Sequence, residues 1–366
     1  MEKSSIPGST GSSEIMSSWY SLVPAGGVAL GNLTPVGQNS GRVGCRFPPN
    51  GHHLAACLKL PNNCQLWGAF WHNTSRSNEI YLVLPQTVYC LEKDLVSTDP
   101  MPKKIYRCYW REDRWQIQEQ HQGCEVAFIG GQYLIRGTHF RSFWQNGWMR
   151  NADLVPIAKV WQSLILTHNR REAYQVLDEG GFFAEMVTLI EPGWSILVKI
   201  FGDYSPPEYS CLGAGATPVT INPLEKIRED WLDSTPENPE GAVLLTGALW
   251  QAKADKEDKE DKGLPVSIPY PIFNHSNQVF AYAYAAEPAI PWQSWKKIKY
   301  GRNREPSTYT LTPGEWLTPA GAVYLWRKEL DSPMTRSGTL QDDSSIDKSR
   351  KRFNNWALGY GHLWLF

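Results

Sequence analysis

Two adjacent histidines, His52 and His53, are the side chains of this sequence best suited to acid-base chemistry. A free imidazole titrates near neutral pH, so it can take up or release a proton under ordinary conditions. Neighbouring side chains on a helix point in different directions, however, and no Asp or Glu lies near enough in the sequence to orient either ring. We therefore expect the pair to contact a ligand or to form a solvated helix cap, rather than to catalyse a reaction.

A second candidate is a pair of glycines close to the carboxyl end, in the segment Leu358-Gly359-Tyr360-Gly361-His362. An apolar run follows and ends the chain. Glycine carries no Cβ, so another backbone, of protein or of nucleic acid, can come closer to it than to other residues. We predict a tight turn that leads into a buried last strand, and the turn is either purely structural or a contact for a nucleic-acid backbone.

Positive charge is concentrated in short segments. The net charge is only -1, because 36 Lys and Arg residues are balanced by 37 Asp and Glu residues. Such a chain must meet phosphates through a local patch, and a solvated surface is the alternative for any patch. One patch combines cations with aromatic residues: Trp292, Trp295, Lys296, Lys297, Lys299, Tyr300, Arg302 and Arg304. Another precedes the glycine turn: Lys348, Arg350, Lys351 and Arg352.

Other motifs that often carry chemistry are missing or incomplete. The seven cysteines contain no C-x-x-C pair, which indicates reduced, cytosolic thiols rather than a zinc site. Gly213-Ala214-Gly215 lacks the third glycine, the helix start and the acidic residue of a dinucleotide-binding motif. We therefore expect no metal, no cofactor and no enzymatic activity.

The elements that must position these residues are mostly short strands. A length of 366 residues suits one large domain or two ordinary ones, of which we expect two, and 42% hydrophobic residues is an ordinary globular composition. β-branched and aromatic residues predict strands at the chain end and over 19–23, 65–71, 80–85, 105–110, 126–135, 194–201, 242–248 and 322–326.

Two helices are also predicted. Asn50 can cap a short helix whose N-terminus faces outward with free N–H groups, a usual place for a phosphate. The spacing of apolar residues over 152–166 predicts an amphipathic helix.

The N-terminal segment and one internal segment have an unusual amino-acid composition. Residues 1–18 are rich in Ser and Gly and predict a disordered tail, without the basic and apolar regions of a secretion signal. No segment reaches about 18 consecutive apolar residues, the length that suggests a membrane span. The segment 253–262 alternates in charge and predicts a solvated loop. We expect a cytoplasmic protein that does not bind a membrane.

Several short motifs, in a consistent order along the chain, resemble one family. FPP at 47–49 is followed by Leu54, Ala55 and the cation Lys59, and TPAGAVYLW at 318–326 is followed by LGYGHL near the end. These segments are similar to those of the third subunit of type III-B (Cmr) CRISPR effector complexes, a member of the RAMP superfamily.

A central passage supports the resemblance, and two segments depart from it. Glu179, Gly180 and Phe183 match the middle of the family pattern. At 31–35 the chain keeps only the proline of a family motif with an upstream arginine, and at 211–219 it lacks the Glu and the Arg of a family Gly-rich turn.

The resemblance implies an α+β fold of two ferredoxin-like (RRM-like) β-α-β-β-α-β units with β-rich insertions. We place the N-terminal unit at 19–160 and the C-terminal unit at 161–366, with a charged loop at about 251–264. The sheet faces and Gly-rich loops of such units suit single-stranded RNA.

The resemblance also implies a function in antiviral defence. The chain would be a non-catalytic RNA-binding subunit that holds the repeat-derived 5′ handle of the crRNA. It would bridge the large signalling subunit to the backbone RAMP subunits of the effector complex, without binding DNA directly. The residues expected to contact RNA are Arg42, Arg46, His52, His53, Lys59, Arg170, Arg171, Lys296, Lys297, Lys299, Arg302, Arg304, Lys351, Arg352, Gly359, Gly361 and His362.

Two other functions are alternatives. Some RAMP relatives are endoribonucleases that process crRNA, but such cleavage needs a positioned group of His, Tyr or Lys side chains, and the sequence does not reveal one. The 17 tryptophans also suggest an aromatic-rich carbohydrate-binding module. A secretion signal and few clustered cations are expected of such a module, and the sequence has the opposite features.

Overall fold

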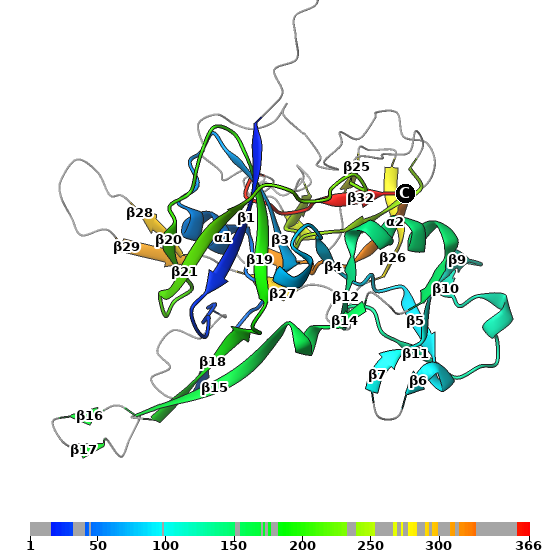
Figure 1. Ribbon diagram of the computed structural model, residues 1–366, viewed down its shortest axis with the longest axis horizontal. Helices are drawn as coiled ribbons and strands as arrows, with labels where there is room; N and C mark the ends of the chain where they lie inside the picture. The colour runs from blue at the N-terminus through cyan, green and yellow to red at the C-terminus, as the bar shows by residue number, and fades with distance from the viewer. Residues whose placement is uncertain are drawn as a thin grey trace, which may run out of the picture.

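The computed structural model describes residues 16–31, 41–43, 45–96, 99–150, 154–169, 171–172, 175–176, 182–232, 239–252, 266–268, 272–273, 277–283, 290–292, 295–298, 308–311, 315–326 and 357–366. Within these residues the chain is a mixed α+β protein, rich in sheet, with two α-helices (Figure 1). Neither of these helices is long and apolar enough to cross a membrane. Short 3-10 helices occur as η1 (Thr74–Arg76), η2 (Glu92–Asp94), η3 (Glu119–His121) and η4 (Ile157–Lys159).

An eight-stranded antiparallel sheet forms the centre of the molecule. Its strands, in spatial order, are β14 (Leu154–Pro156), β12 (Tyr133–Arg136), β4 (Tyr81–Val83), β3 (Gln65–Asn73), β19 (Trp194–Phe201), β1 (Ser17–Pro24), β21 (Thr217–Leu224) and β20 (Tyr209–Leu212). β19 is apolar over most of its length because both faces of the sheet are covered. Ile196 and Val198 point into one core and Leu197 into the other.

The two helices cover opposite faces of this sheet. α1 (Gly51–Leu58) packs Leu54 into the core that contains Ile196 and Val198. α2 (Gly137–Asn146) packs Phe140 into the core on the Leu197 side. The short helix after Asn50 is therefore confirmed, with its apolar residues facing the sheet.

A second sheet, of five strands, contains the end of the chain. Its order is β25 (Ile272–Phe273), β26 (Asn277–Ala283), β31 (Val323–Trp326), β22 (Gly241–Leu244) and β32 (Leu363–Leu365). β32 pairs antiparallel with β22 and is buried, which confirms the predicted last strand. Trp364 of β32 reaches the core shared with α2, whereas Leu363 and Leu365 pack within the second sheet.

The two sheets share one strand order. β3, β19, β1 and β21 lie side by side as the second, third, first and fourth of these strands along the chain. β26, β31, β22 and β32 repeat the same order, and every pair in both sets is antiparallel. This is the order expected of a β-α-β-β-α-β unit, and α1 lies between β1 and β3 as such a unit requires.

The match to two complete ferredoxin-like units is partial. Residues 202–216, which connect β19 to β21, contain the strand β20 and no helix. The eight-stranded sheet also joins strands from both sides of residue 160, and the boundary between the two units stays a prediction.

A four-stranded sheet is inserted between β4 and β14 in the chain. Its order is β11 (Val126–Phe128), β5 (Val88–Leu91), β8 (Lys104–Arg107) and β13 (Trp148–Arg150). Val88, Cys90 and Ile105 form its inner face and pack into the core that holds α2. Tyr89 and Tyr106, which alternate with them along the strands, form part of the outer face.

A long hairpin projects from the body of the molecule (Figure 1). It consists of β15 (Trp161–Asn169) and β18 (Phe182–Ile190), and β2 (Gly41–Val43) pairs parallel with β18. The predicted helix over 152–166 is therefore wrong, because β14, η4 and the first part of β15 occupy that segment.

Two-stranded pairs complete the described structure. They are β6 (Leu95–Val96) with β7 (Asp99–Pro102), β9 (Tyr109–Arg111) with β10 (Arg114–Gln116), β16 (Arg171–Glu172) with β17 (Gln175–Val176), β23 (Trp250–Ala252) with β24 (Val266–Ile268), β27 (Ile290–Trp292) with β30 (Glu315–Leu317), and β28 (Trp295–Ile298) with β29 (Thr308–Leu311). The predicted tail and charged loop lie almost wholly outside the described residues.

Candidate nucleic-acid interface

The first turn of α1 is closed by a reciprocal cap. The Asn50 side-chain oxygen accepts a hydrogen bond from the backbone N–H of His53 at 3.3 Å, and His53 Nδ1 accepts from the backbone N–H of Asn50 at 3.4 Å. Burial, followed by the nearby His52, lowers the pKa of His53 to about 4. His53 is therefore neutral at neutral pH and acts as a helix cap.

His52 is held by a tyrosine from the end of the chain. Its backbone N–H donates to the Tyr360 hydroxyl at 3.4 Å, and its Nδ1 lies 2.7 Å from the same oxygen. Because the hydroxyl accepts one hydrogen bond, its own proton can be donated to Nδ1. Burial lowers the pKa of His52. The structure thus differs from the expected outward-facing helix end, since the N–H groups of His52 and His53 already have partners.

The terminal glycine turn packs directly against this helix end. A Cβ at Gly51 would overlap the carbonyl oxygen of Leu358, so the backbones of the two segments touch. Gly359 is buried with φ +91°, and a Cβ there would lie 3.2 Å from backbone oxygens of Leu66 and Gly68. This close approach between backbones is the one that glycine permits, and in this structure the second backbone is protein.

Gly361 and His362 continue the buried turn. Gly361 has φ +76°, and a Cβ there would meet the ring of Trp250 at 3.1 Å. The backbone N–H of His362 donates to Thr246 Oγ1 at 3.2 Å, and burial lowers the pKa of its imidazole to about 3. His362 is thus a neutral side chain packed beside Trp67, with ring centroids 4.9 Å apart. Packing explains both residues, and an RNA contact stays a prediction.

Two motifs that are some 300 residues apart in sequence therefore meet in one place. The FPP segment leads into α1, and the LGYGHL segment covers the start of α1 before it enters β32. Lys59 is exposed at the end of α1, where it adopts a left-handed conformation with φ 52°. Arg46 is half-buried, and burial lowers its pKa. Of the two predicted cationic contacts that flank α1, Arg46 and Lys59, Lys59 is the one that is open to solvent.

The other predicted contacts are dispersed or lie outside the described residues. Arg42 belongs to β2, Arg171 to β16, and Lys296 and Lys297 to β28; the structure describes the backbone of these residues and not their side chains. The backbone register places Arg42 opposite Ala184 on the projecting hairpin. Outside the described residues lie Arg170, Lys299, Arg302, Arg304, Lys351 and Arg352.

A cluster of arginines around Glu79 was not predicted. Glu79 is only 4% exposed, accepts a hydrogen bond from the Thr138 hydroxyl at 2.9 Å, and pairs with Arg228 at 3.4 Å. Arg76 and Arg136 also lie close: after burial, Arg76 is the largest influence that lowers the pKa of Arg136. Three arginines around one carboxylate leave a surplus of positive charge, which suits a phosphate.

No sequence signal could have revealed this arginine cluster. Its cations come from η1, from the residue before α2, and from the segment that follows β21. Only the folded sheet brings these segments together. Among the residues that the structure describes, no group of three or more His, Cys, Asp and Glu side chains has the geometry to hold a metal ion.

Comparisons with known proteins give limited likenesses. No family model and no curated protein matches the sequence. A chain in the cryo-EM structure of the Type III-B Cmr-beta bound to cognate target RNA and AMPPnP is similar over 94% of this chain and 95% of that chain, with 9% identity and a TM-score of 0.42. A chain in the cryo-EM structure of the Type III-B Cmr-beta bound to cognate target RNA is similar over 84% and 86%, with 8% identity and a TM-score of 0.37. Likenesses of this size do not establish a shared fold.

Proposed function

We propose that this protein is a non-catalytic, cytoplasmic RNA-binding subunit of a type III-B CRISPR effector complex and that it belongs to the RAMP superfamily. The observation that carries the proposal is the repeated strand order of the two sheets, β3-β19-β1-β21 and β26-β31-β22-β32. It supports two ferredoxin-like units, of which the first carries FPP ahead of α1 and the second carries LGYGHL leading into its last strand.

The role within the complex is to hold the 5′ handle of the crRNA and to bridge the large signalling subunit to the backbone RAMP subunits. The junction of α1 with the terminal turn supports this role, because the motifs that resemble the family meet there. In this proposal the exposed cations near these motifs and in the two basic patches contact the RNA phosphates, as expected of a chain without net positive charge.

A partner protein is supported by the exposed apolar residues of the projecting hairpin. Leu164, Ile165 and Leu166 are consecutive in β15 and are 39%, 52% and 42% exposed. Successive side chains of a strand point to opposite faces, so both faces of the hairpin present apolar surface to solvent. Exposed apolar surface of this kind is typical of a site that binds another protein.

The absence of catalysis is proposed from the state of the histidines. His52 and His53 are each held in the cap of α1, and burial lowers the pKa of both. A general base for RNA cleavage works best with a pKa near the operating pH and a free path to the substrate hydroxyl. Neither ring meets both conditions.

The test is to tag the chain in its native host, purify it gently, and identify the bound proteins by mass spectrometry. The proposal predicts several RAMP-type subunits and a large signalling subunit in fixed ratio. Isolation as a lone chain would overturn the proposed assembly. Cleavage of repeat RNA by the pure protein, lost in His52→Ala, would instead favour an endoribonuclease.

A further inference from the structure

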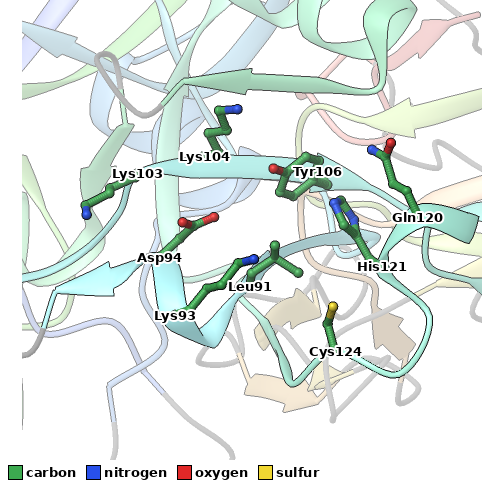
Figure 2. Close-up of a pocket in the computed structure, with 9 residues that line it drawn as sticks. All are labelled: Leu91, Lys93, Asp94, Lys103, Lys104, Tyr106, Gln120, His121 and Cys124. Carbon is green, nitrogen blue, oxygen red and sulfur yellow. The ribbon is translucent and has the colours of Figure 1, made fainter.

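A pocket opens on the outer side of the four-stranded sheet (Figure 2). Its volume of about 520 Å³ falls within the range of small-molecule sites. One side comes from η2 and from the start of β8, and the other comes from η3 and the turn after it. The lining residues are Leu91, Lys93, Asp94, Lys103, Lys104, Tyr106, Gln120, His121 and Cys124.

The pocket carries a surplus of positive charge. Lys93, Lys103 and Lys104 are exposed, and Asp94 is the single carboxylate among the residues that line the pocket. In the described part of the chain, none of these lysines forms a salt bridge. Like charges held together at a surface repel each other, and an anion that enters the pocket would relieve that repulsion.

His121 adds an oriented hydrogen-bond donor. The backbone N–H of Gln118 donates to the Tyr89 hydroxyl at 3.0 Å, and this hydroxyl lies 2.8 Å from His121 Nδ1. Burial raises the pKa of Tyr89 to about 12, so the phenol keeps its proton and donates it to Nδ1. Burial, followed by the charge of Lys93, lowers the pKa of His121, which is therefore neutral with its remaining proton on Nε2.

An exposed aromatic ring lies beside the lysines. Trp148 of β13 is opposite Tyr106 of β8 in the antiparallel register, on the same face as Lys104. The Lys104 Nζ lies 5.3 Å from the centre of the Trp148 ring, and Trp148 is 45% exposed. An exposed indole next to clustered ammonium groups offers a stacking surface for a base and positive charge for its phosphate, the combination used by sites for single-stranded nucleic acid.

We propose that this pocket binds one phosphate of single-stranded RNA, with the neighbouring base stacked on Trp148. Lys93, Lys103 and Lys104 neutralise the phosphate, and the His121 Nε2–H donates a hydrogen bond to it. This inference rests on the proposed function only because that function names RNA as the polyanion. The pocket is a separate surface that contains none of the motifs that resemble the family.

Cys124 makes the pocket directly observable. Cys124 lines the pocket and is exposed, and Cys211 is an exposed thiol on β20, in a different sheet. The rates at which a maleimide modifies these two cysteines in the full-length protein are measured by peptide mass spectrometry. With a single-stranded oligoribonucleotide at about ten times its dissociation constant, mass action predicts roughly tenfold slower modification of Cys124. The Cys211 rate should not change.

Three further ligands distinguish the source of the phosphate. The same RNA as a duplex, adenosine monophosphate and inorganic phosphate are each tested for protection of Cys124. Weaker protection by all three supports the proposal, because none offers a flexible chain with an unstacked base. Equal protection by the duplex, or by either small ligand at the same concentration, would overturn it, as would unchanged modification of Cys124 with the single strand.

Matched variants test the assigned residues. The double change Lys103→Gln and Lys104→Gln should lower the slope of log affinity against log salt by up to about two units, and Trp148→Ala should weaken binding of the single strand. Lys159→Ala, at an exposed lysine on η4, is the control and should change nothing. An unchanged salt slope in the double variant would contradict the proposal.

The outcome is separable from that of the proposed function. Protection of Cys124 by RNA would support RNA binding in the pocket. If the protein nevertheless purifies as a lone chain, its assignment to an effector complex would be contradicted. Purification with RAMP-type subunits, together with no protection of Cys124 in the pure protein, would do the reverse.

Discussion

At the scale of single residues, the glycines of the terminal turn show that one sequence feature can have two different explanations. The sequence indicated that some backbone approaches Gly359 and Gly361. It could not identify that backbone, because Leu66 and Gly68 lie some 290 positions earlier in the chain. The structure places protein atoms there, and this leads to a direct prediction about stability.

Gly359→Ala is expected to lower the free energy of unfolding by about 1 kcal/mol or more, because φ is +91° and the new Cβ would press on two backbone oxygens. RNA affinity per folded molecule should stay the same. Gly26→Ala is the control, since a Cβ added at Gly26 would have no other atom within 4 Å. Urea unfolding and RNA titration of both variants make the comparison. Normal stability with lost RNA binding would show that the glycine serves the RNA instead.

A pH dependence follows from the buried histidines. The pKa values of His53 and His362 are lowered to about 4 and about 3, whereas in the unfolded chain both are near 6.5. Below pH 6.5 the unfolded state therefore binds more protons than the folded state. The contribution of the two neutral histidines to stability is complete above pH 6.5 and is lost as the pH falls toward their pKa values in the folded protein. Each histidine contributes a slope of up to about 1.4 kcal/mol per pH unit.

His53→Gln isolates one of these contributions. Glutamine at this position can still accept the hydrogen bond of a capping box, but it does not titrate. Urea unfolding between pH 7 and pH 4.5 should show a shallower loss of stability than in the wild type. Equal slopes in the two proteins would mean that His53 is not held neutral by the fold.

At the scale of elements, the sequence predicted strands well where apolar residues are continuous. β1, β19 and β32 were anticipated close to their observed bounds, because these strands are buried. The helix predicted over 152–166 was wrong for a physical reason. The apolar residues of this segment fit a helix locally, but β15 is stabilised by pairing with β18, which comes later in the chain. Local spacing contains no information about that partner.

The exposed hairpin residues lead to a prediction about assembly. The triple change Leu164→Ser, Ile165→Ser and Leu166→Ser should leave the melting temperature nearly unchanged, since these side chains are exposed, while reducing recovery of partner subunits in a pull-down. Gln162→Ala, an exposed position on the same strand, is the control. Undiminished recovery of every partner by the triple variant would remove the hairpin from the interface.

At the scale of the whole molecule, the chain end ties the two sheets together. Trp364 lies in β32 of the second sheet, yet its ring contacts Phe140 and Trp144 of α2, and its Nε1–H donates to the carbonyl oxygen of Trp231 at 3.2 Å. The two strand-order repeats therefore share one core. The chain length suggested two domains, but the sequence could not reveal this shared core, because it combines side chains from both halves of the chain.

Trp364→Ala is expected to cost about 3–5 kcal/mol and to keep a single unfolding transition, because the shared core couples both sheets. Trp316→Ala is a matched control at a tryptophan that is 45% exposed, and it should cost about 1 kcal/mol or less. Calorimetry of both variants decides the point. Two separate transitions in the Trp364 variant would show that the sheets unfold independently.

The proposal that this chain holds the 5′ handle of the crRNA is tested most directly by ultraviolet cross-linking of the protein in its native host. The attached RNA is then sequenced. The proposal predicts crRNAs that share one fixed, repeat-derived 5′ sequence, with cross-linked positions concentrated in that handle. Cross-linked RNA of random cellular origin, or the absence of RNA above an untagged control, would contradict the assignment of this chain as the subunit that holds the 5′ handle.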